Sequence, residues 1–174
     1  MADAPDTIVL NRHRDLRGRR SQAWWRRGLL ALVGIVPLLA LLNLFGQRPG
    51  TTSTTVAAAS LGVYAPTTVR GGLLWEARFH IKAHHEIKNA VLVLGSGWLE
   101  GMTLNTLEPS PVGEASNNGK LELTLGHIPA DQSYLLFIQF QTNPTNVGHR
   151  SRPVWLYDGK TLLAKVNQKV TVFP

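Results

Sequence analysis

Hydrophobic residues form one unbroken run near the N-terminus and alternate with polar residues through much of the later chain. The run covers residues 28–45, which carry no charged side chain. At about 1.5 Å per residue, a helix of this length spans about 27 Å, close to a hydrocarbon core of about 30 Å. The pattern therefore predicts a transmembrane helix over residues 28–45, with Pro37 in its middle.

The residues before this run predict its direction across the membrane. Trp24 and Trp25 suit the aromatic belt at a membrane interface. Seven arginines precede the run, whereas Arg48 is the single basic residue in the twenty positions after it. By the positive-inside rule, residues 1–27 form a basic, disordered cytoplasmic tail, and the C-terminal domain lies outside the plasma membrane. The basic residues nearest to the run are Arg19, Arg20, Arg26 and Arg27.

A cleaved signal peptide is the alternative interpretation, because a basic stretch followed by an apolar one describes both. The apolar region of a signal peptide typically has about 7 to 15 residues and ends close to a cleavage site with small residues. Here the run is longer, and the next string of small residues, 57–59, lies more than ten positions after Phe45. The sequence therefore favours a single-pass anchor that stays in the protein.

Alternation with a period of two predicts strands in the later chain, each with one face in a core. The clearest case is residues 73–82, and Asp158-Gly159 is the strongest short hairpin signal. Other turn signals include Asn117-Asn118-Gly119 and Asn143-Pro144. The predicted strands are residues 73–82, 90–94, 102–107, 121–125, 134–141, 154–157, 160–165 and 169–173.

These elements predict an all-β domain behind a membrane anchor. No amphipathic helix follows the anchor, which argues against a nucleotide-binding fold of alternating strands and helices. The expected fold is an immunoglobulin-like antiparallel β-sandwich of about seven strands, preceded by one N-terminal transmembrane helix. The expected organisation is a cytoplasmic tail over 1–27, the helix over 28–45, a flexible linker over 46–60 and the extracytoplasmic sandwich over 61–174.

Two strings resemble bacterial cell-surface immunoglobulin-like domains. LTLGHIPADQSYLLFIQFQ, residues 123–141, resembles the passage in which one strand leads through a Gly-x-Leu/Ile-Pro-Ala turn into a long strand. VWLYDGKTLLAKVNQKVTVFP, residues 154–174, resembles the final hairpin and strand of such domains. In the first string, Asp131 stands where such domains often carry Gly. The resemblance implies an extracytoplasmic adhesion, spacing or partner-binding module, and it transfers no functional residue.

Composition and charge narrow the function further. The 174 residues contain no cysteine, which excludes disulfides, thiolate metal sites, a cysteine nucleophile and a lipid-modified cysteine. The formal net charge is +7, and residues 1–27 supply most of it through seven arginines against three aspartates. We therefore interpret the basic excess as a topology determinant at anionic lipid headgroups, and we expect no nucleic-acid partner.

His84, His85 and Glu86 are the candidate metal ligands. They occupy one predicted turn, and His80 precedes them on the polar face of a strand. Strand residues four apart lie about 13 Å apart along the axis, so His80 and His84 share an ion only if the turn folds back. Solvated turn histidines are therefore favoured over a metal site.

No motif for catalysis or for a cofactor stands out. The sequence has no G-x-S-x-G elbow, no H-E-x-x-H and no Walker loop. We therefore expect no enzymatic activity and no cofactor.

The predicted interaction residues lie in or near two polar loops, residues 97–119 and 143–152. Trp98 and Trp155 are each either an exposed anchor for a partner or a core residue, and the sequence leaves both possibilities open. Arg150 and Arg152, with His149, form a small basic cluster.

The sequence thus predicts a bacterial, membrane-anchored extracytoplasmic interaction module. Its expected role is that of an accessory or structural protein that binds another envelope protein at the bilayer. The alternative is a domain that binds or senses a cell-wall glycan or a metal ion.

Overall fold

The computed structural model describes residues 20–44 and 46–174. These residues belong to two compact units, of which the first ends at Phe45 and the second covers Gly46–Pro174. Residues 1–19, which hold most of the predicted cytoplasmic tail and Arg19, lie outside the described residues.

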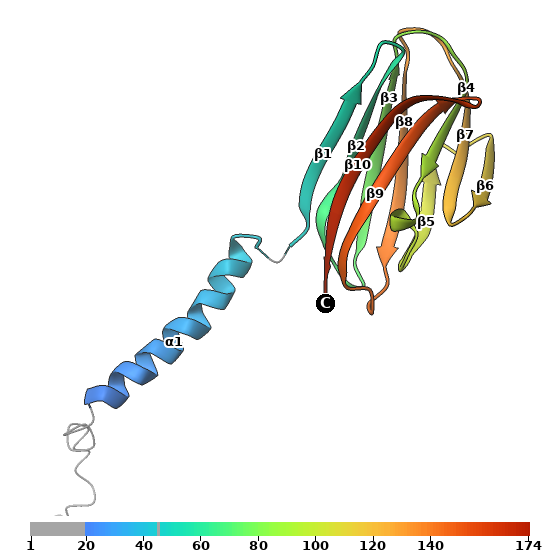
Figure 1. The fold of residues 1–174 in the computed structure, drawn as a ribbon. Coiled ribbons are helices and arrows are strands. Elements are labelled where there is room, and N and C mark those ends of the chain that lie inside the picture. Colours follow the sequence, from blue (N-terminus) through green and yellow to red (C-terminus); the bar gives the residue numbers. More distant parts are fainter. Residues whose placement is uncertain (1–19, 45) are drawn as a thin grey trace, which may run out of the picture. The chain divides into compact units, whose positions relative to one another are not determined.

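Helix α1 covers Arg20–Leu41, so it begins and ends earlier than the predicted range of 28–45 (Figure 1). It ends in a turn where Asn43 has a positive φ of 54°. The amide of Leu44 donates to the Leu39 carbonyl and the amide of Asn43 to the Ala40 carbonyl, the pattern of a Schellman cap. By length and composition alone, Trp24–Leu41 could cross a membrane, and none of that window is buried.

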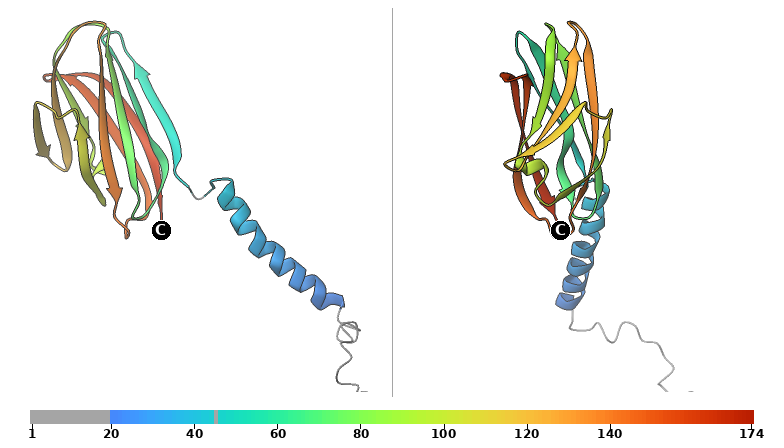
Figure 2. Two further views of the ribbon diagram at one scale, coloured as in Figure 1. Left: turned by 180° about the vertical axis from the view of Figure 1, so that it is seen from behind. Right: turned by 90° about the vertical axis from the view of Figure 1, so that its right-hand side faces the viewer.

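The described residues of the second unit form ten strands and one short 3₁₀ helix, η2 (Ser96–Trp98). The strands are β1 (Arg48–Thr55), β2 (Ala59–Arg70), β3 (Leu74–Ala83), β4 (Ile87–Leu94), β5 (Met102–Glu108), β6 (Gly113–Asn117), β7 (Lys120–Ile128), β8 (Ser133–Thr142), β9 (Gly148–Asp158) and β10 (Thr161–Phe173). The prediction of an all-β sandwich is confirmed, with more strands than the seven expected (Figures 1 and 2).

One continuous sheet forms both layers of this sandwich, in the order β5-β8-β3-β2-β10-β9-β4-β7-β6. The layers join at β2, which pairs with β3 through residues 59–64 and with β10 through residues 68–70. Pro66 lies between the two pairings, where its missing N–H interrupts no ladder to β3 or β10. The first half of β2 therefore belongs to one layer and the second half to the other.

The predicted flexible linker over residues 46–60 is wrong for most of its length. Arg48–Thr55 forms β1, which pairs antiparallel with β2 from Arg48–Thr68 to Thr55–Ser60. β1 contains no large apolar residue, so hydrophobic periodicity could not reveal it. Main-chain hydrogen bonds to β2 hold this strand, and the connection from α1 shortens to residues 42–47.

The turn signal at residues 117–119 forms a two-residue hairpin loop. Asn117 pairs with Lys120, and Asn118 and Gly119 have φ values of 50° and 72°. Two positive φ angles in succession are those of a type I′ turn, which favours Asn-Gly. The loop joins β7 to β6, a short strand inside the region that the sequence predicted as a long loop.

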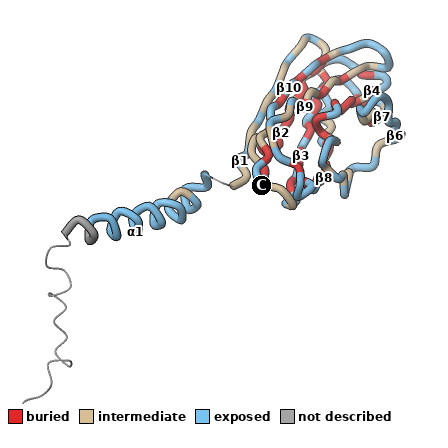
Figure 3. Tube along the Cα trace, turned by 60° about the horizontal axis from the view of Figure 1, so that its bottom comes forward, coloured by how far each residue is buried: buried red, intermediate tan, exposed pale blue. Residues whose placement is uncertain are grey.

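The alternation predicted for residues 73–82 is confirmed in β3, whose side chains are buried at every second position from Trp75. Figure 3 shows buried segments in several strands of the second unit. The largest fully buried side chain is Trp98, which no strand carries. Its ring centroid lies 5.2 Å from Phe79 and 5.7 Å from Phe140. Phe140 in turn stacks on Trp75 at 4.7 Å.

Arg152 also lies in this core, which corrects its assignment to an exposed basic cluster. Strand β9 buries residues 152, 154 and 156 on one face, so Arg152 points inward with Val154 and Leu156 and is 0 % exposed. Its guanidinium carbon lies 4.3 Å from the Trp75 ring and 5.0 Å from the Trp98 ring. Among the described residues, its three side-chain nitrogens have no hydrogen-bond partner. Burial, with a smaller effect from the charge of Arg150, lowers the pKa of Arg152 to about 9.

We predict that Arg152→Met stabilises the domain at pH 7. The cation–π contacts contribute about 2 kcal/mol when desolvated, whereas burying an ion costs several kcal/mol. Methionine fills a similar volume without that cost, so the free energy of unfolding should rise by about 1 to 3 kcal/mol. Urea unfolding of the detergent-solubilised full-length protein measures this change in the free energy of unfolding. As a control, Arg152→Ala leaves a cavity and should destabilise the domain.

The difference in unfolding free energy between the wild type and Arg152→Met should also depend on pH. The folded-state pKa of Arg152, about 9, lies well below its value in the unfolded chain, so the unfolded chain binds more protons above pH 9. Wild-type stability should therefore rise relative to Arg152→Met, by about 1 kcal/mol between pH 8 and pH 10. A difference that stays constant over this range, or a destabilised methionine variant, would contradict the interpretation of Arg152 as a buried cation.

Candidate binding surface

The alternation of β9 and β10 that buries Arg152 sends a second set of side chains outward. Trp155 lies opposite Lys165, and Ser151 lies opposite Lys169, in the register of the two strands. We call this set the outer β9–β10 face. Its members are His149, Ser151, Pro153, Trp155, Tyr157, Lys165, Asn167, Lys169 and Thr171.

Trp155 is the aromatic centre of the outer β9–β10 face. Its ring is partly exposed and lies 4.9 Å from the Lys120 ammonium and 5.6 Å from that of Lys165. Such exposed cation–π contacts contribute about 0.5 to 1 kcal/mol each. Glu122 belongs to the same cross-strand row. Val93 on β4 lies opposite Trp155 on one side and opposite Glu122 on the other. Two ammonium groups thus flank the indole, and one carboxylate lies further along the row.

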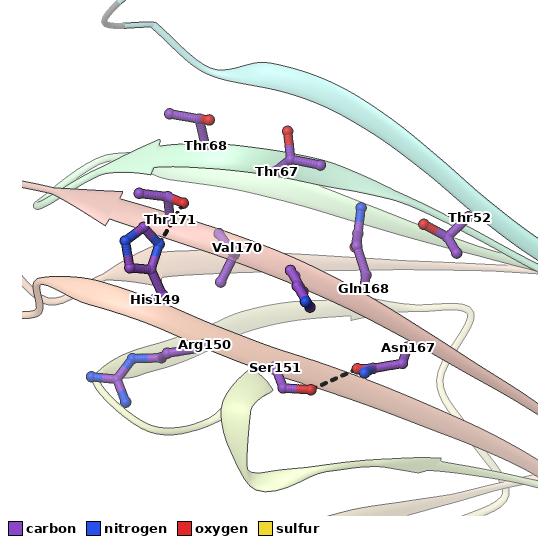
Figure 4. A pocket seen from close by; sticks show the side chains of 11 residues that line it. Thr52, Thr67, Thr68, His149, Arg150, Ser151, Asn167, Gln168, Val170 and Thr171 are labelled. Carbon is purple, nitrogen blue, oxygen red and sulfur yellow. Dashed lines mark hydrogen bonds between the residues drawn. The ribbon is translucent and has the colours of Figure 1, made fainter.

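A polar groove of about 760 Å³ adjoins this face. Figure 4 shows its side chains on β1, β2, β9 and β10. His149 Nδ1 lies 2.9 Å from Thr171 Oγ1, and the Ser151 hydroxyl donates to Asn167 Oδ1 at 2.7 Å. The lining residues are Thr52, Thr67, Thr68, His149, Arg150, Ser151, Asn167, Gln168, Lys169, Val170 and Thr171.

Gln168 holds the strands around this groove together. Its side chain is 2 % exposed, and its amide nitrogen donates to the carbonyls of Ala65 at 2.8 Å and Gly50 at 3.3 Å. One β10 side chain thus binds the main chains of both β2 and β1. This contact places Thr52 and Thr67 beside β10, although they are distant from it in the sequence.

The predicted basic cluster separates into three environments. His149 lies on the outer face, and Arg152 lies in the core. Arg150 is partly buried; its guanidinium donates to Glu100 Oε2 at 2.9 Å and to Asn146 Oδ1 at 3.1 Å. Asn146 in turn donates to the Gly101 carbonyl at 3.0 Å. Arg150 therefore joins two loops and offers little free charge to a partner.

The candidate metal ligands do not converge. His84 Nε2 lies 2.8 Å from Ser60 Oγ, whereas Glu86 Oε1 lies 2.9 Å from His127 Nε2. His85 is exposed. In the part of the chain that the structure describes, no three His, Asp or Glu side chains are grouped as metal ligands.

The residues proposed for membrane topology lie in the first turns of α1. Trp24 and Trp25 are 72 % and 81 % exposed, and Arg26 and Arg27 are also exposed. Arg20 begins the helix. Their role at a membrane stays a prediction.

The opposite layer also has an aromatic–cation row on its outer surface. The Arg78 guanidinium carbon lies 5.5 Å from the Tyr64 ring and 5.6 Å from the Phe137 ring. Its Nε also lies 2.6 Å from Glu76 Oε1. This ion pair neutralises the row, which makes it less suited to a charged partner than the outer β9–β10 face.

Comparisons with known proteins return structures but no sequence relatives. No family model matches the chain, and no curated protein matches it significantly. A CARDB domain from Pyrococcus furiosus is similar, at 15% identity over 71% of this chain and 88% of that one, with a TM-score of 0.42.

Two further structures are also similar. The third ScaC cohesin of Acetivibrio cellulolyticus, solved with the ScaB dockerin, is 12% identical over 62% of this chain and 94% of that one, with a TM-score of 0.43. The chitin-binding domain of a Pyrococcus furiosus chitinase is 10% identical over 68% and 98%, with a TM-score of 0.35. These likenesses transfer no partner, ligand or site residue to this chain.

Trp98 and Trp155, which the sequence assigned neither to the core nor to the surface, should differ sharply in their contribution to stability. Trp98→Ala empties the centre of the core and should lower the free energy of unfolding by about 3 to 5 kcal/mol. Trp155→Ala removes an outward side chain and should cost about 1 kcal/mol or less. Urea unfolding curves recorded by near-ultraviolet circular dichroism give the free energy of unfolding of each variant. Equal losses for the two variants would place Trp155 in the core and remove the centre of the outer face.

Proposed function

We propose that the chain is a single-pass membrane protein whose β-domain binds another envelope protein outside the cytoplasm. The observation that carries the proposal is Trp155 on the outer β9–β10 face, flanked by Lys120 and Lys165. Tryptophan is enriched among residues that dominate the energy of protein interfaces. The proposed partner presents carboxylates to the two ammonium groups.

The anchor is the other half of this proposal. Helix α1 is long and apolar enough to span a bilayer, and none of its window is covered by the chain. Three charged or aromatic positions at its start, Trp25, Arg26 and Arg27, suit a cytoplasmic interface. The bilayer is thus the first proposed partner of the chain, and the plasma membrane is its proposed location.

A cell-wall glycan is the second candidate, and the groove that adjoins the outer β9–β10 face favours it. Five hydroxyl side chains line that groove, together with amide groups, and they can exchange hydrogen bonds with a polyol. The five are Thr52, Thr67, Thr68, Ser151 and Thr171. Both candidates are binding roles, and neither requires a cofactor.

The topology predicts that a reporter enzyme that works only outside the cytoplasm is active when fused after Pro174. A second fusion, placed before residue 20, should be inactive. Enzyme activity normalised to protein amount measures both. The reverse pattern in stably produced fusions would overturn the proposed orientation.

The partner proposal predicts that a photoreactive amino acid at position 155 crosslinks one envelope protein in the native host. The charge reversals Lys120→Glu and Lys165→Glu should each weaken that crosslink, because they repel the partner's carboxylates. The matched control is Lys82→Glu, an exposed lysine on β3 in the opposite layer, which should leave the yield unchanged.

Two results would contradict this assignment. A crosslink that responds equally to Lys82→Glu and Lys165→Glu would show that the outer β9–β10 face is not the recognition site. Crosslinks to wall glycan instead of protein would support the second candidate in place of the first.

A further inference from the structure

One end of the β-domain exposes a group of large apolar side chains. Leu73, Leu74, Val147 and Phe173 are 44 %, 51 %, 53 % and 43 % exposed. Scattered exposed apolar residues are ordinary, but a local concentration marks an interaction site. We call this group the tethered end.

Backbone hydrogen bonds bring these segments together. The amide of Gly72 donates to the Thr142 carbonyl at 2.9 Å, and the amide of Thr142 donates to the Leu73 carbonyl at 3.0 Å. The amide of Gly71 donates to the Phe173 carbonyl at 2.8 Å. The turn before β3, the end of β8 and the end of β10 therefore meet at one end of the sandwich.

The chain enters the β-domain from α1 at this same end. The side-chain amide of Gln47 donates to the Leu74 carbonyl at 3.0 Å, and β1 begins at the next residue. Arg48 lies opposite Thr68, which lies opposite Thr171 near the end of β10. Residues 42–47 connect α1 to β1, and seven peptide steps cover at most about 24 Å.

The charged side chains here are mainly basic. Arg48 and Arg70 are exposed, and neither pairs with an Asp or Glu side chain within residues 46–174; Arg70 Nε donates to the Pro174 oxygen at 3.1 Å. The nearby carboxylates are already paired, Glu76 with Arg78 and Glu100 with Arg150. Exposed apolar side chains beside arginines that no Asp or Glu side chain neutralises suit the headgroup region of an anionic bilayer.

The opposite end differs in chemistry. There the amide of His84 donates to the Ala58 carbonyl, and the amide of Asp131 donates to the Ala83 carbonyl, so three turns meet. Among small apolar residues, these turns carry two histidines, two carboxylates and one amide, namely His84, His85, Glu86, Asp131 and Gln132. Ala57 is exposed among them and offers a neutral reference position.

We propose that the tethered end inserts its apolar side chains into the outer surface of the membrane. This inference rests on the proposed membrane anchor and adds a second, peripheral contact with lipid. Leu73, Leu74, Val147 and Phe173 enter the headgroup region, while Arg48 and Arg70 bind anionic lipid phosphates. The contact holds the β-domain against the bilayer and fixes the direction in which the outer β9–β10 face points.

The absence of cysteine permits a direct test in the full-length chain. Single cysteines replace Val147 or Ala57, and each is labelled with the same environment-sensitive fluorophore. The labelled proteins are reconstituted in vesicles of phosphatidylcholine with and without phosphatidylglycerol, which also contain lipids with a spin-labelled acyl chain as quencher. Quenching at Val147→Cys should exceed that at Ala57→Cys several-fold, and phosphatidylglycerol should increase it. Arg48→Gln with Arg70→Gln should abolish the increase.

A label at Val33→Cys in α1 distinguishes failure of the proposed lipid contact from failure of the membrane anchor on which it rests. Quenching at position 33 with equal, weak quenching at positions 147 and 57 would overturn the lipid contact alone. No quenching at position 33 would instead overturn the membrane anchor. The circular dichroism of each variant must match that of the wild type, so that misfolding does not expose the label.

Discussion

A stack of three aromatic rings and one guanidinium joins the two layers of the β-domain. Trp75 and Phe140 belong to β3 and β8 in one layer, Arg152 belongs to β9 in the other, and Trp98 packs against all three. A chain without cysteine has no disulfide for this task. The stack also specifies register, because shifting β9 by one residue would turn Arg152 to solvent and bury its outward neighbours. Arg152, together with Val154 and Leu156 on the same buried face, therefore determines which side chains of β9 point outward.

The candidate surface follows from the same constraint. With Arg152 inside, the odd-numbered residues of β9 face outward, and Trp155 lies beside Lys165 across the ladder. Gln168 has the equivalent role on β10, because its buried amide binds the main chains of β1 and β2. Two polar side chains that point inward thus position the outward ones. Because both carry buried polar atoms without a partner among the described residues, they specify the arrangement at some cost in stability.

The sequence predicted those parts whose local pattern is strong. Strand β3 alternates without a break, and Asn118-Gly119 has the turn chemistry that its positive φ angles require. β1 and β6 were missed because edge strands that bury little leave no hydrophobic period. Arg152 was assigned to the surface because the rings that accept it lie far away in the sequence, on β3 and in η2. The groove was missed for the same reason, since four strands contribute to it.

Strand β1 has a consequence for function beyond the fold. Because β1 pairs with β2, the connection between α1 and the β-domain is residues 42–47, and not the predicted residues 46–60. Along β9, His149 lies near the tethered end, and Trp155 lies six residues further, about 20 Å at 3.4 Å per residue. The outer β9–β10 face therefore extends from the end of the β-domain at which the chain enters as far as Trp155, and a partner that contacts both the groove and Trp155 has to cover that length.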